Sequence, residues 1–90
     1  MKKVAAVKAN PDHSLDLRFN DGSLRRFDVT PYLDFGVFSE LKDLSYFNQV
    51  TIAYGTVHWP HEQDISPDTL YLESIAIDDA NGPNLEFGTV

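Results

Sequence analysis

The 90-residue sequence contains no cysteine. Disulfide bonds, iron–sulfur clusters, thiolate zinc sites and cysteine nucleophiles are therefore excluded. A chain without cysteine suits a reducing compartment, so we predict a cytoplasmic protein. Long apolar runs are also missing. The run at residues 4–7 ends at Lys8, which indicates a strand rather than a signal peptide, and no membrane association is expected.

Basic side chains are absent from the second half of the chain. Residues 1–42 carry all seven Lys and Arg against six acidic side chains, whereas residues 43–90 carry eight acidic side chains and no basic one. Affinity for nucleic acids comes largely from basic side chains on phosphates, so direct DNA or RNA binding is not expected. Arg18, Arg25 and Arg26 could form a small basic patch on a predicted hairpin, but we interpret them as solvated residues on an outer sheet face.

The hydrophobic patterns predict one small α+β domain. Ninety residues suffice for one compact domain and are too few for two. The predicted order is three strands, short helices, two strands and a last helix, with antiparallel hairpins and the short helices packed on one sheet face. We expect the domain to span residues 1–76. Residues 77–90 are acidic and rich in turn-forming residues, which predicts a flexible tail.

The first hairpin has a register that follows from burial. Strands are predicted at residues 4–9, 15–19 and 24–29, and the middle one alternates apolar with charged side chains. A two-residue turn at Asp21-Gly22 would place charged side chains opposite the leucines on the buried face. A three-residue turn with Gly22 in the left-handed conformation instead pairs Leu15 with Phe27 and Asp16 with Arg26. We therefore predict the second register.

Short helices are predicted between the third and fourth strands. Thr30 is placed as a cap, Pro31 as the first residue of a single helical turn, and Gly36 as its end. Asp43 is placed to start a further turn within residues 37–47. The apolar residues of this segment have helical spacing and are expected to lie in the core. They are Val37, Phe38, Leu41, Leu44 and Phe47.

The second half of the domain combines a hairpin with a capped helix. Strands at residues 50–53 and 56–59 flank a two-residue turn at Tyr54-Gly55, which pairs Ile52 with Val57 and predicts that Trp59 is buried. In the helix that follows, Ser66 is the predicted N-cap and Pro67 the first residue, with Asp68 near the positive end of the helix dipole. Ile65 and Leu70 have the spacing of a hydrophobic staple, and the helix is expected to end near Ser74.

Three residues of this region are candidate metal ligands: His58, His61 and Asp64. They lack the helical His-Glu-x-x-His spacing, and Asp64 is expected instead to order the turn before the helix. A triad of Ser66, His61 and Asp64 is disfavoured because the three residues are sequence neighbours and Ser66 is already a cap. We therefore predict no catalytic residue, no metal ligand and no cofactor.

Five ordered motifs resemble a bacterial family called domain of unknown function 2442. They are Phe19-x-Asp21-Gly22, Phe27-Asp28-Val29-x-Pro31-x-Leu33, Val37-Phe38-x-x-Leu41, Gly55-Thr56-Val57-x-Trp59-Pro60 and Asp64-Ile65-x-Pro67-Asp68-Thr69-Leu70-Tyr71. The resemblance covers residues 4–73 and implies a domain similar to the N-terminal domain of longer proteins that carry a repressor-like helix-turn-helix. This chain has an acidic tail in that place. No catalytic residues are established for the family.

Structural roles are expected for the residues that these motifs and the turn chemistry select. They are Gly22, Pro31, Gly55, Trp59, Pro60, Asp64, Ser66, Pro67 and Tyr71.

The resulting hypothesis is a non-enzymatic cytoplasmic protein-interaction module, the acidic member of a two-protein pair similar to a toxin–antitoxin operon. One alternative is an accessory domain in transcriptional regulation that acts through a separate DNA-binding protein. A second is an enzyme or metal site around His58, His61 and Asp64. The sequence leaves the identity of the partner and the oligomeric state open.

Overall fold

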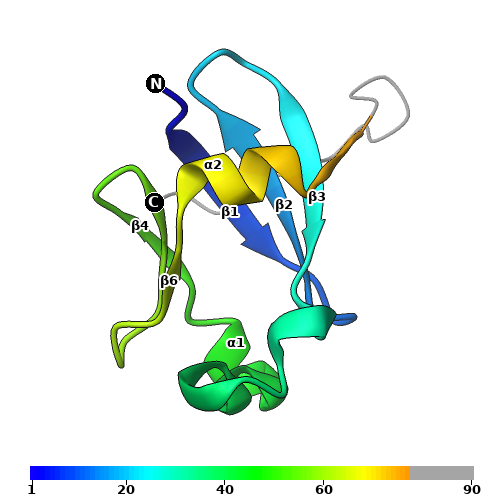
Figure 1. Cartoon of the computed structure of the whole chain (residues 1–90), viewed down its shortest axis with the longest axis vertical. Helices are drawn as coiled ribbons and strands as arrows, with labels where there is room; N and C mark the ends of the chain where they lie inside the picture. The colour runs from blue at the N-terminus through cyan, green and yellow to red at the C-terminus, as the bar shows by residue number, and fades with distance from the viewer. Residues whose placement is uncertain (78–90) are drawn as a thin grey trace.

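A computed structural model of the chain describes residues 1–77, so the predicted tail lies outside the described residues except for Ile77. Two antiparallel sheets are joined by short helices, and the predicted α+β class is confirmed (Figure 1). The elements in chain order are β1 (Val4–Ala9), β2 (Ser14–Phe19), β3 (Leu24–Asp28), the 3₁₀ helices η1 (Thr30–Tyr32) and η2 (Gly36–Lys42), α1 (Leu44–Phe47), β4 (Thr51–Ala53), β5 (Thr56–His58), β6 (Asp64–Ile65), α2 (Pro67–Leu72) and β7 (Ile75–Ala76).

The first sheet has the order β1-β2-β3-β7 and the second the order β4-β5-β6. A hydrogen bond from the Val4 N–H to the Gly55 carbonyl, 2.8 Å long, ties β1 to the turn of the second sheet. In Figure 1, α2 crosses the first sheet, while η2 and α1 gather at the opposite end of the molecule. The sequence did not predict β6 and β7, because a two-residue strand is too short to show an alternating pattern.

One hydrophobic core lies between these elements. Trp59 is fully buried, as predicted, and its ring stacks on Phe47 with 5.9 Å between the centroids. The buried members of the core are Val4, Val7, Leu15, Leu17, Phe19, Phe27, Val29, Leu33, Leu41, Phe47, Val57, Trp59, Ile65 and Leu70. Both sheets and the helices contribute, so a single core holds the described chain together.

The predicted register of the first hairpin is confirmed. Leu15 is paired with Phe27 and Asp16 with Arg26. Gly22 has φ of 86°, and the turn is closed by a 2.9 Å hydrogen bond from the Phe19 N–H to the Ser23 carbonyl. In this register Leu15, Leu17 and Phe19 of β2 are buried together with Phe27 of β3, as the sequence pattern indicated for the bulged turn.

Replacing Gly22 with Val is expected to destabilise the protein by about 1 kcal/mol or more, because a β-branched residue tolerates positive φ poorly. A Cβ atom at this position would contact nothing within 4 Å, so the loss is conformational rather than steric. Urea denaturation measures it. Gly22→Asn is the control and should cost less, since Asn adopts this conformation more readily. Equal stability of the Val variant and the unsubstituted protein would contradict the turn assignment.

The second hairpin and the last helix also follow the sequence. Ile52 is paired with Val57 across the Tyr54-Gly55 turn. Ser66 is the N-cap of α2 and accepts a 3.2 Å hydrogen bond from the Thr69 N–H, with Pro67 in the first turn. The helix ends at Leu72, two residues earlier than expected.

The cap at the start of the middle segment differs from the prediction. The N-cap of η1 is Val29 rather than Thr30, and the Asp28 carboxylate accepts a 2.9 Å hydrogen bond from the Thr30 N–H. An acidic side chain two residues upstream thus replaces the hydroxyl of Thr30 at this turn. Asp43 starts the next helix as predicted, accepting a 3.0 Å hydrogen bond from the Ser45 N–H.

The apolar stripe of residues 37–47 is only partly in the core. Leu41 and Phe47 are buried, but Val37 is 67% exposed and Leu44 is 36% exposed. The prediction assumed an α-helix, whereas η2 is a 3₁₀ helix with three residues per turn. In that geometry Phe38 and Leu41 share one face and Val37 lies outside it. The prediction that Val37 belongs to the core is wrong for this reason. It is wrong for Leu44 because the extended backbone of Asp43, with φ of −76° and ψ of 113°, interrupts the helical period between η2 and α1.

Candidate functional site

The three candidate metal ligands do not form one site. His58 lies in β5 opposite Asp64 in β6, while His61 lies in the turn between these strands and turns to Glu40. Asp64 is therefore a strand residue, and its predicted role in a turn before α2 is wrong. Between residues 1 and 77, no three His, Asp or Glu side chains are grouped closely enough to hold a metal ion. Ser66 serves as the helix cap.

His61 instead belongs to a polar cluster formed by Glu40, Tyr46, His61 and Gln63. Its Nδ1 lies 2.7 Å from Oε2 of Glu40. The Gln63 amide donates to Oε1 of Glu40 at 2.8 Å and accepts from the Tyr46 hydroxyl at 2.6 Å. The His61 backbone N–H donates to that hydroxyl at 2.8 Å, and the two rings stack with centroids 5.3 Å apart. These contacts fix the β5–β6 turn against η2.

The turn itself is anchored by Trp59. Its backbone N–H donates to the Gln63 carbonyl at 3.0 Å and its carbonyl accepts from the Glu62 N–H at 2.9 Å. The indole N–H donates to the Phe47 carbonyl at 2.9 Å. Glu62 has φ of 73°, which reverses the chain after Pro60. The Trp59-Pro60 motif thus places His61 and Gln63 where η2 can meet them.

The chemistry available to this cluster is limited. An ionised carboxylate only accepts hydrogen bonds, so this contact needs a proton on Nδ1 of His61; a neutral ring would then present Nε2 as an acceptor, the arrangement of a general base. The Tyr46 hydroxyl, however, already both donates and accepts, and the Gln63 side chain is fully used. In the described part of the chain every buried side-chain nitrogen and oxygen has a hydrogen-bond partner. The cluster holds a surface in place and contains no activated nucleophile.

That surface carries exposed apolar side chains. Phe35 is 65% exposed and Val37 is 67% exposed. The backbone carbonyls of both residues are hydrogen-bonded. The Phe35 carbonyl accepts from the Phe38 N–H at 2.9 Å, and the Val37 carbonyl accepts from the side-chain amide of Gln63 at 3.0 Å. We call the exposed side chains of Phe35 and Val37, together with the carboxylates of Asp34 and Glu40, the η2 face.

Sequence reasoning missed this face. It assigned Val37 to the core because it assumed an α-helical period, and it could not pair Glu40 with His61, which lie 21 residues apart. The sequence signal that could have found it is Gly36, the first residue of η2, because a glycine often marks a break in the helical period, and here it has φ of 45°. Lys42 is the basic residue of this segment, and it forms a 3.0 Å ion pair with Asp34.

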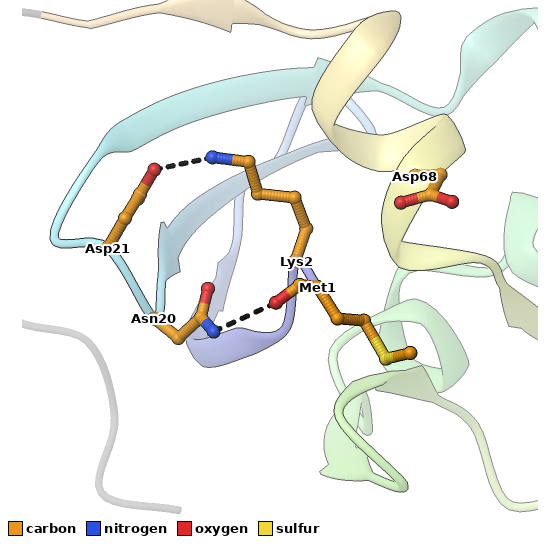
Figure 2. Close-up of a pocket in the computed structure, with 5 residues that line it drawn as sticks. All are labelled: Met1, Lys2, Asn20, Asp21 and Asp68. Atoms are coloured by element: carbon orange, nitrogen blue, oxygen red, sulfur yellow. Dashed lines mark hydrogen bonds and ion pairs between the residues drawn. The ribbon is translucent and has the colours of Figure 1, made fainter.

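A second candidate is an open hollow of about 480 Å³ beside the N-terminus (Figure 2). Lys2 forms a 2.6 Å ion pair with Asp21, and the Asn20 amide donates to the Met1 carbonyl at 3.0 Å. Asp68 faces the hollow from α2 in Figure 2. Lys2 also lies over the ring of Tyr71, 4.0 Å from its centroid. The polar groups drawn on one side of the hollow bind one another, which indicates a tie between the N-terminus and the β2–β3 turn.

This tie predicts an acid-sensitive interaction. Hydrogen bonds from Lys2 and then Ser23 hold the pKa of Asp21 well below its usual range. A carboxyl with a depressed pKa in the folded state stabilises the protein at neutral pH, and that contribution is lost as the pH falls below about 4. Carboxyl NMR should show Asp21 titrating well below the usual aspartate range. Lys2→Ala should return the Asp21 pKa towards its ordinary value, whereas Lys8→Ala should leave it unchanged.

Arg25 does not lie on a solvated outer sheet face, as was expected for all three arginines of the hairpin. Arg25 is half-buried against α2, where its guanidinium donates to the hydroxyl and carbonyl oxygens of Ser74, both at 2.6 Å. It also lies over Tyr71, 4.5 Å from the ring centroid. Arg26 is exposed but donates to both oxygens of Asp16. The prediction is wrong for Arg25 because α2 covers its side of β3.

Fold and surface together define a small α+β domain with two antiparallel sheets and a polar cluster that supports an exposed face. Residues 4–76 match the family described as Protein of unknown function (DUF2442), and the chain belongs to this family. No curated protein and no solved structure matches the chain. Within residues 1–77, none of the helices has the length and hydropathy needed to cross a membrane.

Proposed function

We propose that this protein is a non-enzymatic protein-interaction module that binds a basic partner protein. The observation that carries the proposal is the η2 face, where the exposed side chains of Phe35 and Val37 lie on hydrogen-bonded backbone that also carries Asp34 and Glu40. Exposed apolar side chains with a polar rim are typical of binding surfaces. A cytoplasmic location and a role as the acidic member of a two-protein pair belong to the same proposal.

The charge distribution supports a basic partner. Residues 43–90 have eight acidic side chains and no basic one, and two of the three arginines on the hairpin are bound to groups of this chain. Charges of opposite sign speed the encounter of two proteins and exclude like-charged partners. A partner rich in Lys or Arg fits this distribution better than a nucleic acid does.

The satisfied hydrogen bonding of the cluster favours binding over catalysis. Catalytic sites commonly contain titratable groups with strained or incomplete pairing that is completed by the substrate. In the cluster, Tyr46 and Gln63 have partners on this chain for their side-chain oxygens and for the Gln63 amide nitrogen. This arrangement stabilises a surface, and it leaves few hydrogen bonds for a substrate to complete.

Affinity purification of the tagged chain from its native host tests the proposal. The expected result is a protein of net positive charge whose complex with the purified chain weakens as salt increases. A DNA-binding partner would instead favour the accessory role in transcriptional regulation. Failure to capture any protein at low salt would contradict the interaction module.

Direct binding to DNA and zinc is expected to be absent. The purified chain should not shift duplex DNA at micromolar concentration even at low salt, where electrostatic binding is strongest. Zinc should leave the melting temperature nearly unchanged, because a ligand that binds only the native state would raise it. A zinc-dependent rise that His61→Ala abolishes would restore the metal-site alternative, and saturable DNA binding would restore the regulator.

A further inference from the structure

We infer that the η2 face is the docking site, and that it receives a segment of the partner in which apolar side chains are flanked by Lys or Arg. The inference rests on the proposed function and adds to it a location and a chemistry. Phe35 and Val37 supply the apolar contacts, and the carboxylates of Asp34 and Glu40 supply the charged rim.

The face is rigid before any partner binds. Gln63, 2% exposed, lies behind it and donates to both the Val37 carbonyl and the Glu40 carboxylate, at 3.0 and 2.8 Å. A buried amide is costly unless it is fully hydrogen-bonded, and here the Tyr46 hydroxyl completes its bonding. A surface fixed in this way loses little conformational entropy on binding, which favours affinity.

The charge of the face decides between a foreign partner and a second copy of this chain. A twofold dimer through this face would bring the same patch of each copy together, so the acidic Asp34 and Glu40 of one copy would face the acidic patch of the other. Like charges in contact are unfavourable, and the nearby Lys42 is already paired with Asp34. Lys or Arg side chains of a partner would instead pair with the half-exposed Glu40 or replace Lys42 at Asp34, since that ion pair is exposed to water.

A second exposed apolar pair supplies the matched control. Leu72 and Ile75 are 79% and 66% exposed, and they lie at the end of α2 and in β7, away from η2 (Figure 1). Replacing either pair with Ser removes a similar amount of exposed apolar surface. Only the pair on the η2 face should affect docking.

The probe is a fluorescent amphipathic peptide built from lysine and leucine, and fluorescence anisotropy with the full chain measures its affinity. Phe35→Ser/Val37→Ser is expected to weaken binding about tenfold or more, whereas Leu72→Ser/Ile75→Ser should change it less than about twofold. A peptide of equal charge with serine in place of leucine should bind more weakly and respond equally to the two variants. Melting temperatures check that both variants fold. If Phe35→Ser/Val37→Ser does not fold, the single variant Val37→Ser replaces it in the binding measurement.

The rim is tested by neutralising one carboxylate at a time. Asp34→Asn and Asp64→Asn change the net charge equally, but only Asp34 lies on the η2 face. Asp34→Asn should weaken binding of the lysine–leucine peptide more than Asp64→Asn does. Equal effects would show attraction to net charge alone and would overturn the assigned face.

Other outcomes show whether only the docking site or the whole proposed function is wrong. No saturable binding of the peptide, or a greater loss in the Leu72/Ile75 variant, overturns the docking site. If the Phe35/Val37 variant still captures the same basic protein from the native host as the unsubstituted chain does, the interaction module stands and the η2 face does not. If the unsubstituted chain captures none, the proposed function itself fails.

Discussion

Trp59→Ala is expected to lower the free energy of unfolding by about 3–5 kcal/mol, the range for removing a buried aromatic side chain. Trp59 is fully buried, stacks on Phe47 and donates its indole N–H to the Phe47 carbonyl at 2.9 Å. The substitution would leave a cavity between the second sheet and α1 and an unpaired carbonyl beside it. Small domains are stable by only about 5–15 kcal/mol, so much of the variant should be unfolded at moderate urea concentrations.

Two controls separate burial from hydrogen bonding. Phe35→Ala truncates an exposed aromatic residue and should change stability by less than about 0.5 kcal/mol. Trp59→Phe keeps most of the ring but removes the N–H donor, so it should cost less than Trp59→Ala. A Trp59→Ala protein with a near-native unfolding midpoint would contradict the packing of this residue.

Arg26→Ala is expected to destabilise the protein by about 2–3 kcal/mol. The Asp16 side chain is only 2% exposed, and Arg26 donates to its two oxygens at 2.6 and 3.0 Å. Removing the arginine leaves a buried carboxylate without its charged partner, which commonly costs about 3–5 kcal/mol. The expected loss is smaller here because the Arg26 side chain is 45% exposed and water screens part of the interaction.

A double-mutant cycle provides the control for this prediction. Asp16→Asn/Arg26→Ala removes the buried charge together with its partner, so it should be more stable than Arg26→Ala alone. Unfolding by urea at neutral pH gives the four free energies of the cycle. A double variant less stable than Arg26→Ala would show that the cost comes from lost packing of the arginine rather than from an unpaired carboxylate.

Features set by neighbouring residues were predictable from the sequence. The left-handed Gly22, the Ser66 cap and the Tyr54-Gly55 turn each depend on residues a few positions apart. Their conformations follow from local sterics and hydrogen bonds, which the residue types report directly. The register of the first hairpin was predictable as well, because a one-residue shift would have exchanged its buried and exposed faces.

The candidate site was far less accessible from the sequence. Its contacts join Glu40 to His61 and Gln63 to Val37, across 21 and 26 residues. No local pattern encodes which side chains meet over such distances. Asp64 and His58 were candidate metal ligands together with His61 because they are close in sequence. In the structure His58 and Asp64 are paired across β5 and β6, whereas His61 lies in the turn and contacts Glu40 of η2.

The sequence by itself determined the α+β class, the hairpin turns, the burial of Trp59 and the uneven charge, since each depends on composition or on short-range geometry. Only the tertiary structure decided that Val37 is exposed, that Arg25 lies beneath α2 and that β7 extends the first sheet. The physical reason is that these features depend on how separate elements pack. The free energy of packing is shared among residues distant in sequence, and the 3₁₀ geometry of η2 overrides the helical period that its apolar residues suggest.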